Sequence, residues 1–477
     1  MLGLIVLKEI RSHLLSFRFL AVFVLLLVFV PATVVILTND AVRQQDDYSR
    51  RQAEIESYLS RYAHFNRLGG VVQPSQPPIP FLALVRGLTS EPNLNAFDSD
   101  PLPVMFPLVD LTFIVAVLLS LAALILSYDA VSGEREDGTL RLVLTNGVRR
   151  GTVLFGKILG SAAALFLPFL TAMAAGLVVI LLNPRLAWRG SDWGALAGIL
   201  AGAFVYLGVF VGLGVLVSSR HASSSASILT SLFVWVLVVL VVPNLSPYAA
   251  SLLRPTPSTI AVGREVNRLT DIERDELGRK LSAERRAAVV RDNPVLEGVE
   301  RMGEGEVQEA IKRDPVFAKA HEIFRKESEA AWTEANRIQG AKAEVLRGDL
   351  RRREEAQTKL ALGLSMASPF ASFTYLAADL SNTGMRNTRH FGRLSAAFWT
   401  SYREYARKKT EEMRAANPTV DVWNTAVDVR DMPRFVYTEE ALAARFKAAV
   451  VPFLLLAGLA LAVFAASVLA FNRADVR

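Results

Sequence analysis

The chain has 477 residues, of which 52% are hydrophobic and 21% charged, with 53 Lys+Arg, 46 Asp+Glu and a formal net charge of +7. A mean hydropathy of +0.31 beside so many charges indicates two kinds of segment averaged together, which argues against an ordinary soluble enzyme. Because there is no cysteine, disulfides, thiolate metal sites and cysteine nucleophiles are excluded. The five histidines are scattered too widely for metal-ligand spacing, so no metal site is expected.

Six mostly apolar runs predict membrane-spanning helices. Lys157, near the start of the third run, is the only lysine or arginine within them, and the fifth run needs its polar flanks to reach across. Spanning about 30 Å of hydrocarbon takes roughly 20 mostly apolar residues. The runs are 19–37, 105–127, 153–182, 193–217, 227–242 and 448–471. The first exceeds the apolar core of a signal peptide, which has about 7 to 15 residues, and no A-x-A site follows it. We therefore interpret it as a retained anchor.

Lysine and arginine beside the spans predict the orientation, because short cytoplasmic flanks are enriched in both. They gather in the N-terminal flank, in the loop after the second run and in the C-terminal tail, which predicts that these parts, and so both termini, are cytoplasmic. The predicted division is 1–37 (amphipathic stretch and first span), 38–104 (small extracytoplasmic segment), 105–244 (spans two to five, with a cytoplasmic loop at 129–152), 245–445 (large extracytoplasmic domain) and 446–477 (sixth span and cytoplasmic tail).

The segment 245–445 holds most of the charge and is predicted to be helical. Between Pro315 and Glu355 apolar residues recur every three or four positions, and Asp314 before Pro315 is a candidate helix cap. The preferred interpretation of this pattern is a solvated coiled-coil or bundle helix without a functional site. The proline-rich stretch 73–80 is predicted to be extended. The predicted fold class is an all-α polytopic membrane protein with six transmembrane helices and a large helical domain between spans five and six.

One stretch looks like a phosphate-binding loop but lacks an essential residue. It has the pattern G-x-x-x-x-G-K from Gly151 to Lys157, yet Ile158 stands where the magnesium-binding hydroxyl belongs, and the stretch leads into a span. No other catalytic motif is present, so we expect no catalytic site and no cofactor on this chain. Basic residues lie beside the membrane or are matched by acids, which argues against nucleic-acid binding.

The loop from Asp129 to Lys157, DAVSGEREDGTLRLVLTNGVRRGTVLFGK, carries the most specific pattern. Its mixture of leucines and charges is typical of an interfacial amphipathic element. The loop resembles the signature of ABC-2 type transporter permeases, E-x-E-x-G-T-L, leucines, a basic residue and then G-K opening the next span. The residues at these positions are Glu134, Arg135, Glu136, Gly138, Thr139, Leu140, Arg149, Arg150, Gly156 and Lys157. Gly147 replaces the proline that is common before the basic residue.

The resemblance extends along the chain. An amphipathic N-terminal stretch ahead of six spans matches the interfacial elbow helix of the family. The stretches 368–384 and 431–435 resemble a subfamily with a large extracytoplasmic insertion, similar to permeases of gliding-motility and nitrous-oxide-reductase maturation systems. It implies a separate cytoplasmic ABC ATPase subunit that binds ATP and Mg²⁺ and receives the loop as a coupling helix. It also implies a second permease chain, identical or similar; the large domain would offer a surface to an extracytoplasmic protein partner.

Two further sets of residues lie in the spans. Small residues at four-residue spacing predict close helix packing in lipid, either within the chain or at a dimer face; these are Gly194, Gly198, Gly202, Gly208 and Gly212. Candidates to line a pathway are Asp110, Ser227, Thr230 and Ser231. The alternatives are an interfacial acid at Asp110 and hydroxyls that bond their own helix carbonyls.

These features are compatible with three functions to different degrees. The first is a permease subunit that couples ATP hydrolysis to export or to motion transmitted to an extracytoplasmic partner. The second is a membrane-anchored scaffold that presents the helical domain without transport. An ion-coupled carrier is disfavoured, because proton or sodium coupling needs intramembrane acids and only Asp110 is available. A scaffold does not need a glutamate-rich loop with family spacing, so the first function is preferred.

Overall fold

The computed structural model describes residues 2–60, 63–87, 109–145, 148–186, 188–417 and 420–473. Within them the regular elements are helices, apart from one isolated antiparallel bridge between Ala63 and Val427. The chain forms two compact units, unit 1 (Met1–Asn244 with Ser365–Arg477) and unit 2 (Leu245–Leu364). The predicted all-α fold with six helices able to span a membrane is confirmed.

Four of the six candidate spans each coincide with one long helix. They are α2 (Phe17–Leu59), α10 (Arg150–Leu181), α11 (Gly190–Arg220) and α20 (Leu442–Arg473). The second span, Leu111–Glu136, consists of α6 (Leu111–Phe113), the π-helical turn η2 (Ile114–Leu119), α7 (Ser120–Ser127) and α8 (Ser132–Glu136). The fifth, Ser224–Leu253, consists of α12 (Ser224–Trp235), the π-helical turn η3 (Val236–Val241) and α13 (Val242–Leu253). The start of the predicted second run, 105–108, lies outside the described residues.

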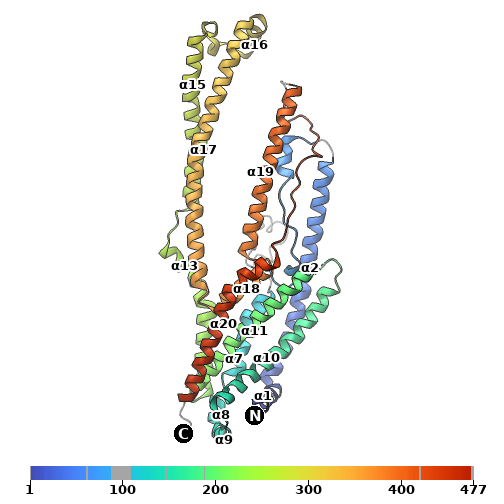
Figure 1. Ribbon diagram of the computed structural model, residues 1–477, viewed down its shortest axis with the longest axis vertical. Coiled ribbons are helices and arrows are strands. Elements are labelled where there is room, and N and C mark those ends of the chain that lie inside the picture. Colours follow the sequence, from blue (N-terminus) through green and yellow to red (C-terminus); the bar gives the residue numbers. More distant parts are fainter. Residues whose placement is uncertain are drawn as a thin grey trace. The chain divides into compact units, whose positions relative to one another are not determined.

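Helix α11 forms the centre of unit 1, with α7, α10, α12, α18 and α20 packed on it (Figure 1). Its side chains are apolar or small on every side, as expected for a helix that other helices enclose. Tyr206, Leu207 and Phe210 in its middle are fully buried. The spans that contain α7, α10, α12 and α20 thus share α11 as a common packing partner.

The glycines of α11 allow two neighbours to approach closely. A Cβ added at Gly198 would stand 2.9 Å from Leu380 and from Phe446, and one added at Gly202 would stand 2.7 Å from Leu376. Gly194 and Gly212 have similar contacts at 3.0 and 3.1 Å, whereas Gly208 has nothing within 4 Å. At four of the five predicted positions the close neighbour thus belongs to this chain, on α18 or α20.

Helix α18 (Pro369–Leu380) reaches the middle of the spans without crossing them. Its Phe373 ring stacks on the mid-span ring of Tyr206 at 5.0 Å, and the hydroxyl of Ser368, its N-cap, donates to the carbonyl of Val238 within η3. Twelve residues of helix measure about 18 Å, which is too short to cross a bilayer. The structure divides the predicted 245–445 domain, because residues 365–445 belong to the same compact unit as the spans and residues 245–364 form the other unit.

The part of unit 1 beyond the apolar runs has a small core of its own. Helix α2 continues to Leu59 and packs there with α3 (Phe65–Val71), α19 (Met385–Ala416) and the segment 420–435. Residues 72–79 belong to no regular element, and Ile79 has extended backbone angles directly before the short turn η1 (Pro80–Ala83). Of the predicted extracytoplasmic segment 38–104, residues 88–104 lie outside the described residues.

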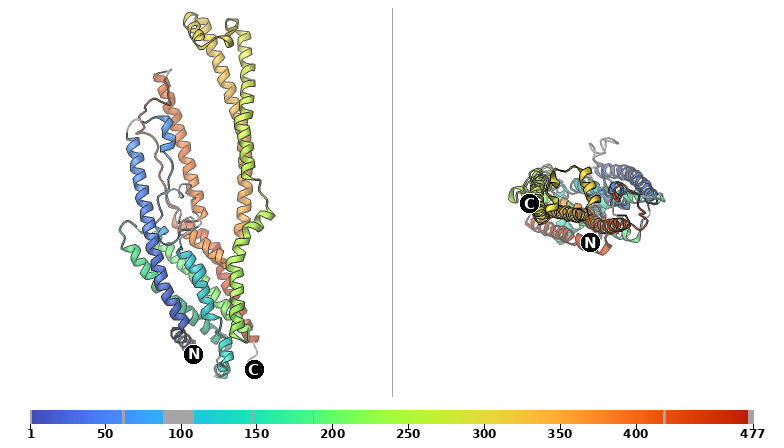
Figure 2. Two further views of the ribbon diagram at one scale, coloured as in Figure 1. Left: turned by 180° about the vertical axis from the view of Figure 1, so that it is seen from behind. Right: turned by 90° about the horizontal axis from the view of Figure 1, so that it is seen from above.

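Unit 2 is a helical hairpin (Figures 1 and 2). One side has α14 (Thr259–Asn267), a π-helical turn η4 (Arg268–Glu273) and α15 (Arg274–Asp292); the short turns η5 (Pro294–Leu296) and η6 (Val299–Arg301) and α16 (Glu304–Arg313) form its tip. The return side is α17 (Pro315–Ser365). The predicted start of this long helix is confirmed, since Asp314 Oδ1 accepts from the backbone N–H of Val316 at 2.8 Å.

Candidate functional site

The signature loop forms α8 (Ser132–Glu136) and α9 (Thr139–Thr145) at one end of unit 1, called here the loop end. The N-terminal helix α1 (Leu2–Leu14) and the last turns of α20 lie at the same end (Figures 1 and 2). Gly138 joins α8 to α9 with a φ of +70°, a left-handed conformation that favours glycine. Residues 146–147, including the predicted departure at Gly147, lie outside the described residues.

Two signature residues meet in a buried network of charges. Glu134 Oε1 lies 2.9 Å from Lys157 Nζ and 2.7 Å from Lys8 Nζ, and Lys157 Nζ also donates to Glu9 Oε1 at 3.1 Å. The Lys157 side chain is only 2% exposed, and those of Glu9 and Glu134 are 10% and 15% exposed. Two lysines and two glutamates from α1, α8 and α10 therefore form a neutral group, the ion quartet. Charges at this depth are tolerated because they are paired.

Glycines at the start of α10 bring α1 close enough for these pairs. A Cβ at Gly156 would stand 2.6 Å from Ile5 Cγ2, and a Cβ at Gly160 would collide with Glu9 Cβ. On the opposite side of α1, Leu4 and Leu7 are 70% and 63% exposed. Helix α1 thus packs its charged face against α10 and exposes its apolar face, as expected for a helix that lies at a membrane interface.

The titration of two α1 side chains reflects this packing. Burial acts to lower the pKa of Lys8, but the hydrogen bond and charge of Glu134 and the charge of Glu9 outweigh it and raise the pKa above its usual value. Burial lowers the pKa of His13, whose Nε2 lies 3.0 Å from Ser161 Oγ. At neutral pH the packed side of α1 thus has a charged lysine beside α8 and a neutral histidine beside α10.

The other side of α8 is tied to the turn between α11 and α12. Glu136 accepts from the backbone N–H of Ser224 at 3.1 Å and from its hydroxyl at 2.6 Å, at the first residue of α12. Arg135 Nη1 donates to the carbonyl of His221 at 3.1 Å, and Ser218 Oγ accepts from the backbone N–H of Ser132 at 2.9 Å. The two glutamates of the signature therefore hold α8 from opposite sides.

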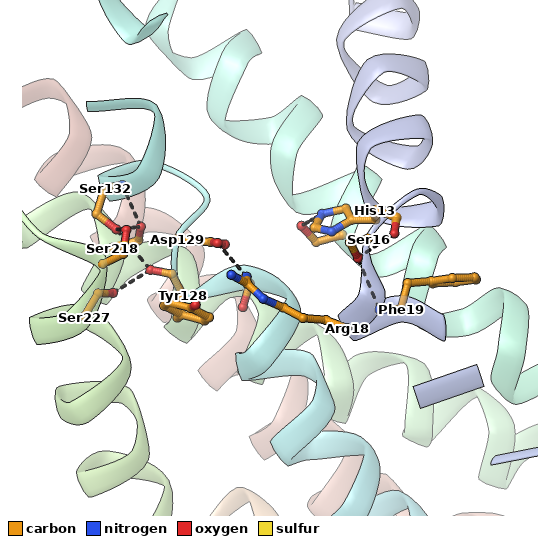
Figure 3. A network of polar contacts seen from close by, with 12 residues as sticks. His13, Ser16, Arg18, Phe19, Tyr128, Asp129, Ser132, Ser218 and Ser227 are labelled. Atoms are coloured by element: carbon orange, nitrogen blue, oxygen red, sulfur yellow. Dashed lines mark hydrogen bonds and ion pairs between the residues drawn. The ribbon is translucent and has the colours of Figure 1, made fainter. Parts of the chain in front are cut away.

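Further contacts fasten the start of the loop (Figure 3). Arg18, at the beginning of α2, reaches Asp129 at 2.6 Å, and Ser227 of α12 donates to the carbonyl of Tyr128 at 2.6 Å. At the end of the loop, Arg150 Nη1 donates to the carbonyls of Phe471 and Asn472 at 3.3 and 3.0 Å. The loop is thus attached to α2, α10, α11, α12 and α20.

Part of the loop remains on the surface. Leu140 is buried with Val131, Leu154, Val215 and Phe471, and forms the small core beneath the loop. The neighbouring Leu142 is 67% exposed. The other exposed positions are Glu136, Asp137, Gly138, Thr139, Arg141, Thr145 and Arg149. We call Asp137, Gly138, Thr139, Arg141 and Leu142 the exposed loop face.

The four candidate pathway residues do not gather at one place. Asp110 caps α6 at the far end of the second span, where it accepts from the backbone N–H groups of Phe113 at 2.8 Å and Arg86 at 3.1 Å. Ser227, Thr230 and Ser231 lie in the first turns of α12, at the loop end. Thr230 Oγ1 lies 3.3 Å from His221 Nε2, while Ser231 Oγ is buried without a hydrogen-bond partner among the described residues.

Sequence reasoning missed Glu9, Ser218 and Ser224 as members of this site. Glu9 is the only acidic residue among residues 1–37, which was the available signal. Ser218 and Ser224 stand at the ends of two spans and have no pattern that distinguishes them from ordinary helix-capping residues.

Comparison with known proteins is consistent with this architecture. Residues 4–476 match the family model described as ABC-2 family transporter protein. The chain is 41% identical over 95 residues to the "Probable ABC transporter permease protein NosY" of Pseudomonas aeruginosa, which covers 20% of this chain and 31% of the relative. It is 31% identical over 134 residues to the NosY protein of Stutzerimonas stutzeri, covering 28% and 49%.

The chain therefore spans less than half the length of each of these two relatives. The family model, in contrast, covers nearly all of it, and the resemblance first noted in the loop is confirmed. With six helices able to span a membrane, it is a multi-pass membrane protein. The protein belongs to the ABC-2 family of transporters.

Proposed function

We propose that the chain is the permease subunit of an ABC-2 type transporter and that a separate cytoplasmic ATPase subunit drives it. The ATPase would bind ATP and Mg²⁺, and the exposed loop face would dock on it. A second permease chain, identical or similar, would complete the transporter in the bacterial inner membrane, with the loop end and both termini in the cytoplasm. The observation that carries the proposal is the loop itself, which is fastened to five spans and still presents an exposed face.

The attachments support a mechanical role for the loop. Glu134 links α8 to α10 through Lys157, and Glu136 links it to the start of α12. A displacement of the loop by an ATPase would therefore act on several spans together. ATP binding and hydrolysis would bias the permease between two arrangements of these spans, since a ligand shifts an equilibrium only by its different affinity for the two states.

The exposed loop face has the chemistry of a docking surface. Leu142 offers an exposed apolar side chain, with Asp137 and Arg141 exposed beside it. Apolar anchors surrounded by polar residues are typical of protein interfaces. A scaffold that only presents unit 2 would not need such a face together with the buried attachments beneath it. Either export of a substrate or motion transmitted to an extracytoplasmic partner of unit 2 is compatible with this role.

The proposal is tested with the chain in lipid nanodiscs together with ABC ATPase subunits of the same genome, beginning with any encoded beside it. We expect permease-stimulated ATP hydrolysis, and we expect Leu142→Ala to reduce the stimulation several-fold, since truncating an interface anchor costs about 1–2 kcal/mol. The matched control is Leu229→Ala, which truncates a leucine that is 70% exposed on a span. Full stimulation by Leu142→Ala would refute the docking face.

Orientation is tested separately. The cysteine-free chain allows single probes, so Arg141→Cys should react with a membrane-impermeant maleimide only from the cytoplasmic side. Glu327→Cys in unit 2 should react only from outside. The reverse pattern would overturn the proposed orientation.

A further inference from the structure

Two of the six spans contain a π-helical turn. Turn η2 (Ile114–Leu119) lies in the second span, and η3 (Val236–Val241) lies in the fifth. π-Helix is rare, occurs mostly as single turns and is frequent at functional sites. Because its hydrogen bonds run from residue i to i+5, such a turn holds one extra residue and changes the direction in which the following residues face.

In each turn a hydroxyl group from another helix donates to the carbonyl of the third residue. Tyr206 Oη of α11 donates to the carbonyl of Ala116 in η2 at 2.6 Å. Ser368 Oγ of α18 donates to the carbonyl of Val238 in η3. Side chains that insert into the backbone ladder are a known cause of irregular turns in helices. The same arrangement thus occurs twice, in two different spans.

The two turns are connected to each other. Ser120 Oγ, which donates to the carbonyl of Ala116 at 2.7 Å, accepts from Trp235 Nε1 at 2.9 Å. Trp235 is the residue directly before η3. Phe373 of α18 completes the ring of contacts by stacking on Tyr206 at 5.0 Å. The second span, α11, α18 and the fifth span therefore form a closed circuit.

The donors of this circuit are buried. Tyr206 and Ser120 are fully buried, Ser368 is 1% exposed and Trp235 is 7% exposed. In the core of a membrane protein no water replaces a lost hydrogen bond, so each hydroxyl favours the backbone arrangement in which its bond is made. A third π-turn among the described residues, η4 in unit 2, differs: its Thr270 hydroxyl donates to the carbonyl of Val266 in the adjoining helix α14.

We propose that Tyr206 and Ser368 are positioning residues that hold η2 and η3 in the π form, and that the two turns act as a paired hinge in the second and fifth spans. The inference depends on the proposed function only for the driving force of the hinge, which is displacement of the loop by an ATPase. Stabilisation of the two π-turns by the two hydroxyls does not depend on that function.

Closing a π-turn into α-helix shifts the residues on one side of it by one position, which is a rotation of about 100°. On the far side of η2, Ile114 would then take the direction that Phe113 has now, and Phe113 would take that of Thr112. Phe113 is 43% exposed, whereas Ile114 and Thr112 are 1% and 9% exposed. When the turn closes into α-helix, a cysteine at position 114 should therefore become more accessible to a thiol reagent and one at position 113 less accessible.

The test uses single cysteines in the otherwise cysteine-free chain, in nanodiscs and without any ATPase. We expect N-ethylmaleimide to modify Phe113→Cys faster than Ile114→Cys, as followed by mass spectrometry. Adding Tyr206→Phe should raise the rate for Ile114→Cys by roughly tenfold and lower that for Phe113→Cys, because losing one buried hydrogen bond changes an equilibrium by about that factor. Ser368→Ala should shift both probes in the same directions through Trp235 and Ser120.

Two matched variants remove hydroxyls, one part-buried and one buried, that do not reach a π-turn. Tyr375→Phe removes a bond to Ser365 Oγ at 2.8 Å, and Ser467→Ala removes one to the carbonyl of Gly212 at 3.1 Å. Neither should change the two rates. Equal shifts in these controls, or unchanged rates in Tyr206→Phe, would overturn the role of the hydroxyls. A shift with Tyr206→Phe but not with Ser368→Ala would overturn the pairing.

Two further measurements keep the test decisive. Should Tyr206→Phe fail to accumulate in the membrane, Ser120→Ala removes the other donor to Ala116 and should shift the probes in the same way. ATP and the partner ATPase are then added to the unsubstituted chain carrying each probe. Unchanged modification rates on adding ATP and the ATPase would show that the hinge takes no part in transport. If instead Tyr206→Phe leaves the rates unchanged while ATP and the ATPase alter them, the role of the hydroxyls is wrong and the permease assignment still stands.

Discussion

Lys157 is the residue on which the attachment of α1 most depends, and its replacement gives a quantitative prediction. Lys157→Met keeps most of the volume and removes the charge that bonds both Glu9 and Glu134. Breaking a buried ion pair from one side costs about 3–5 kcal/mol, because a charge is left without its partner. Lys8 remains within 2.7 Å of Glu134 and 3.7 Å of Glu9, so we expect the lower limit, about 3 kcal/mol.

This loss should appear as local opening of α1 and not as unfolding of the spans. A change of about 3 kcal/mol corresponds to roughly 150-fold in an equilibrium constant. Hydrogen exchange of the α1 amides, measured by mass spectrometry in nanodiscs, should therefore accelerate by about two orders of magnitude. The control is Lys8→Met, whose side chain is 57% exposed and which should cost less than about 1 kcal/mol.

Two results would refute this reasoning. One is unchanged exchange of α1 in Lys157→Met, and the other is an effect of Lys8→Met as large as that of Lys157→Met. A double variant, Lys157→Met with Glu9→Gln, should cost less than the sum of the single changes, because it removes both members of one pair.

Three further predictions follow from other contacts. Gly202→Ala should lower thermal stability by about 1–3 kcal/mol through overpacking against α18, whereas Gly208→Ala, with open space at its Cβ, should be neutral or slightly stabilising in the same melting experiment. Gly278→Ala should loosen the α15–α17 hairpin, because the added Cβ would collide with the indole ring of Trp332 on α17. Gly340→Ala has open space at its Cβ and should not, so only Gly278→Ala should speed limited proteolysis of unit 2 in the full chain. Because burial lowers the pKa of His13, its contribution to α1 docking is present above about pH 6.5 and is lost as the pH falls below that value. Exchange of α1 should therefore accelerate from pH 7.5 to 5.5, and His13→Gln should remove that dependence.

The two signature glutamates give a further prediction. Glu134→Ala with Glu136→Ala is expected to uncouple a partner ATPase while the chain stays folded in the membrane. The ion quartet adds that α1 should open in the same variant, since Glu134 contacts both lysines. Full permease-stimulated ATP hydrolysis by this double variant would contradict the coupling role, whatever the state of α1.

The spans and the long helix α17 were predictable because each leaves a continuous signal. A long apolar run with at most one charge marks a span, and three- and four-residue spacing of apolar side chains marks the buried face of a helix. The boundary at residue 364 was not predictable in this way. Helix α18 has an apolar run too short for a span, so it reads like a core helix of a soluble domain.

The site was predictable only in part. The signature spacing identified Glu134 and Lys157, but Lys157 and Glu9 are 148 positions apart in the chain, and no periodic pattern connects them. Lys8 was interpreted as an orientation charge, which is the ordinary explanation for a lysine beside a span. The π-turns left no sequence signal, because Val and Leu in η3 also suit a regular transmembrane helix.

The position of α18 has a consequence for how the protein is made. Helix α18 leaves the ribosome after α11 and the fifth span but before α20, and it packs against all three. Twelve residues are too few for stable insertion as a span of their own, and the Ser368 hydroxyl has its acceptor only on the fifth span. Because α20 is its most extensive neighbour, we expect docking of α18 to be completed only after α20 has inserted. Truncation just before Leu442 should leave five inserted spans with α18 open to protease.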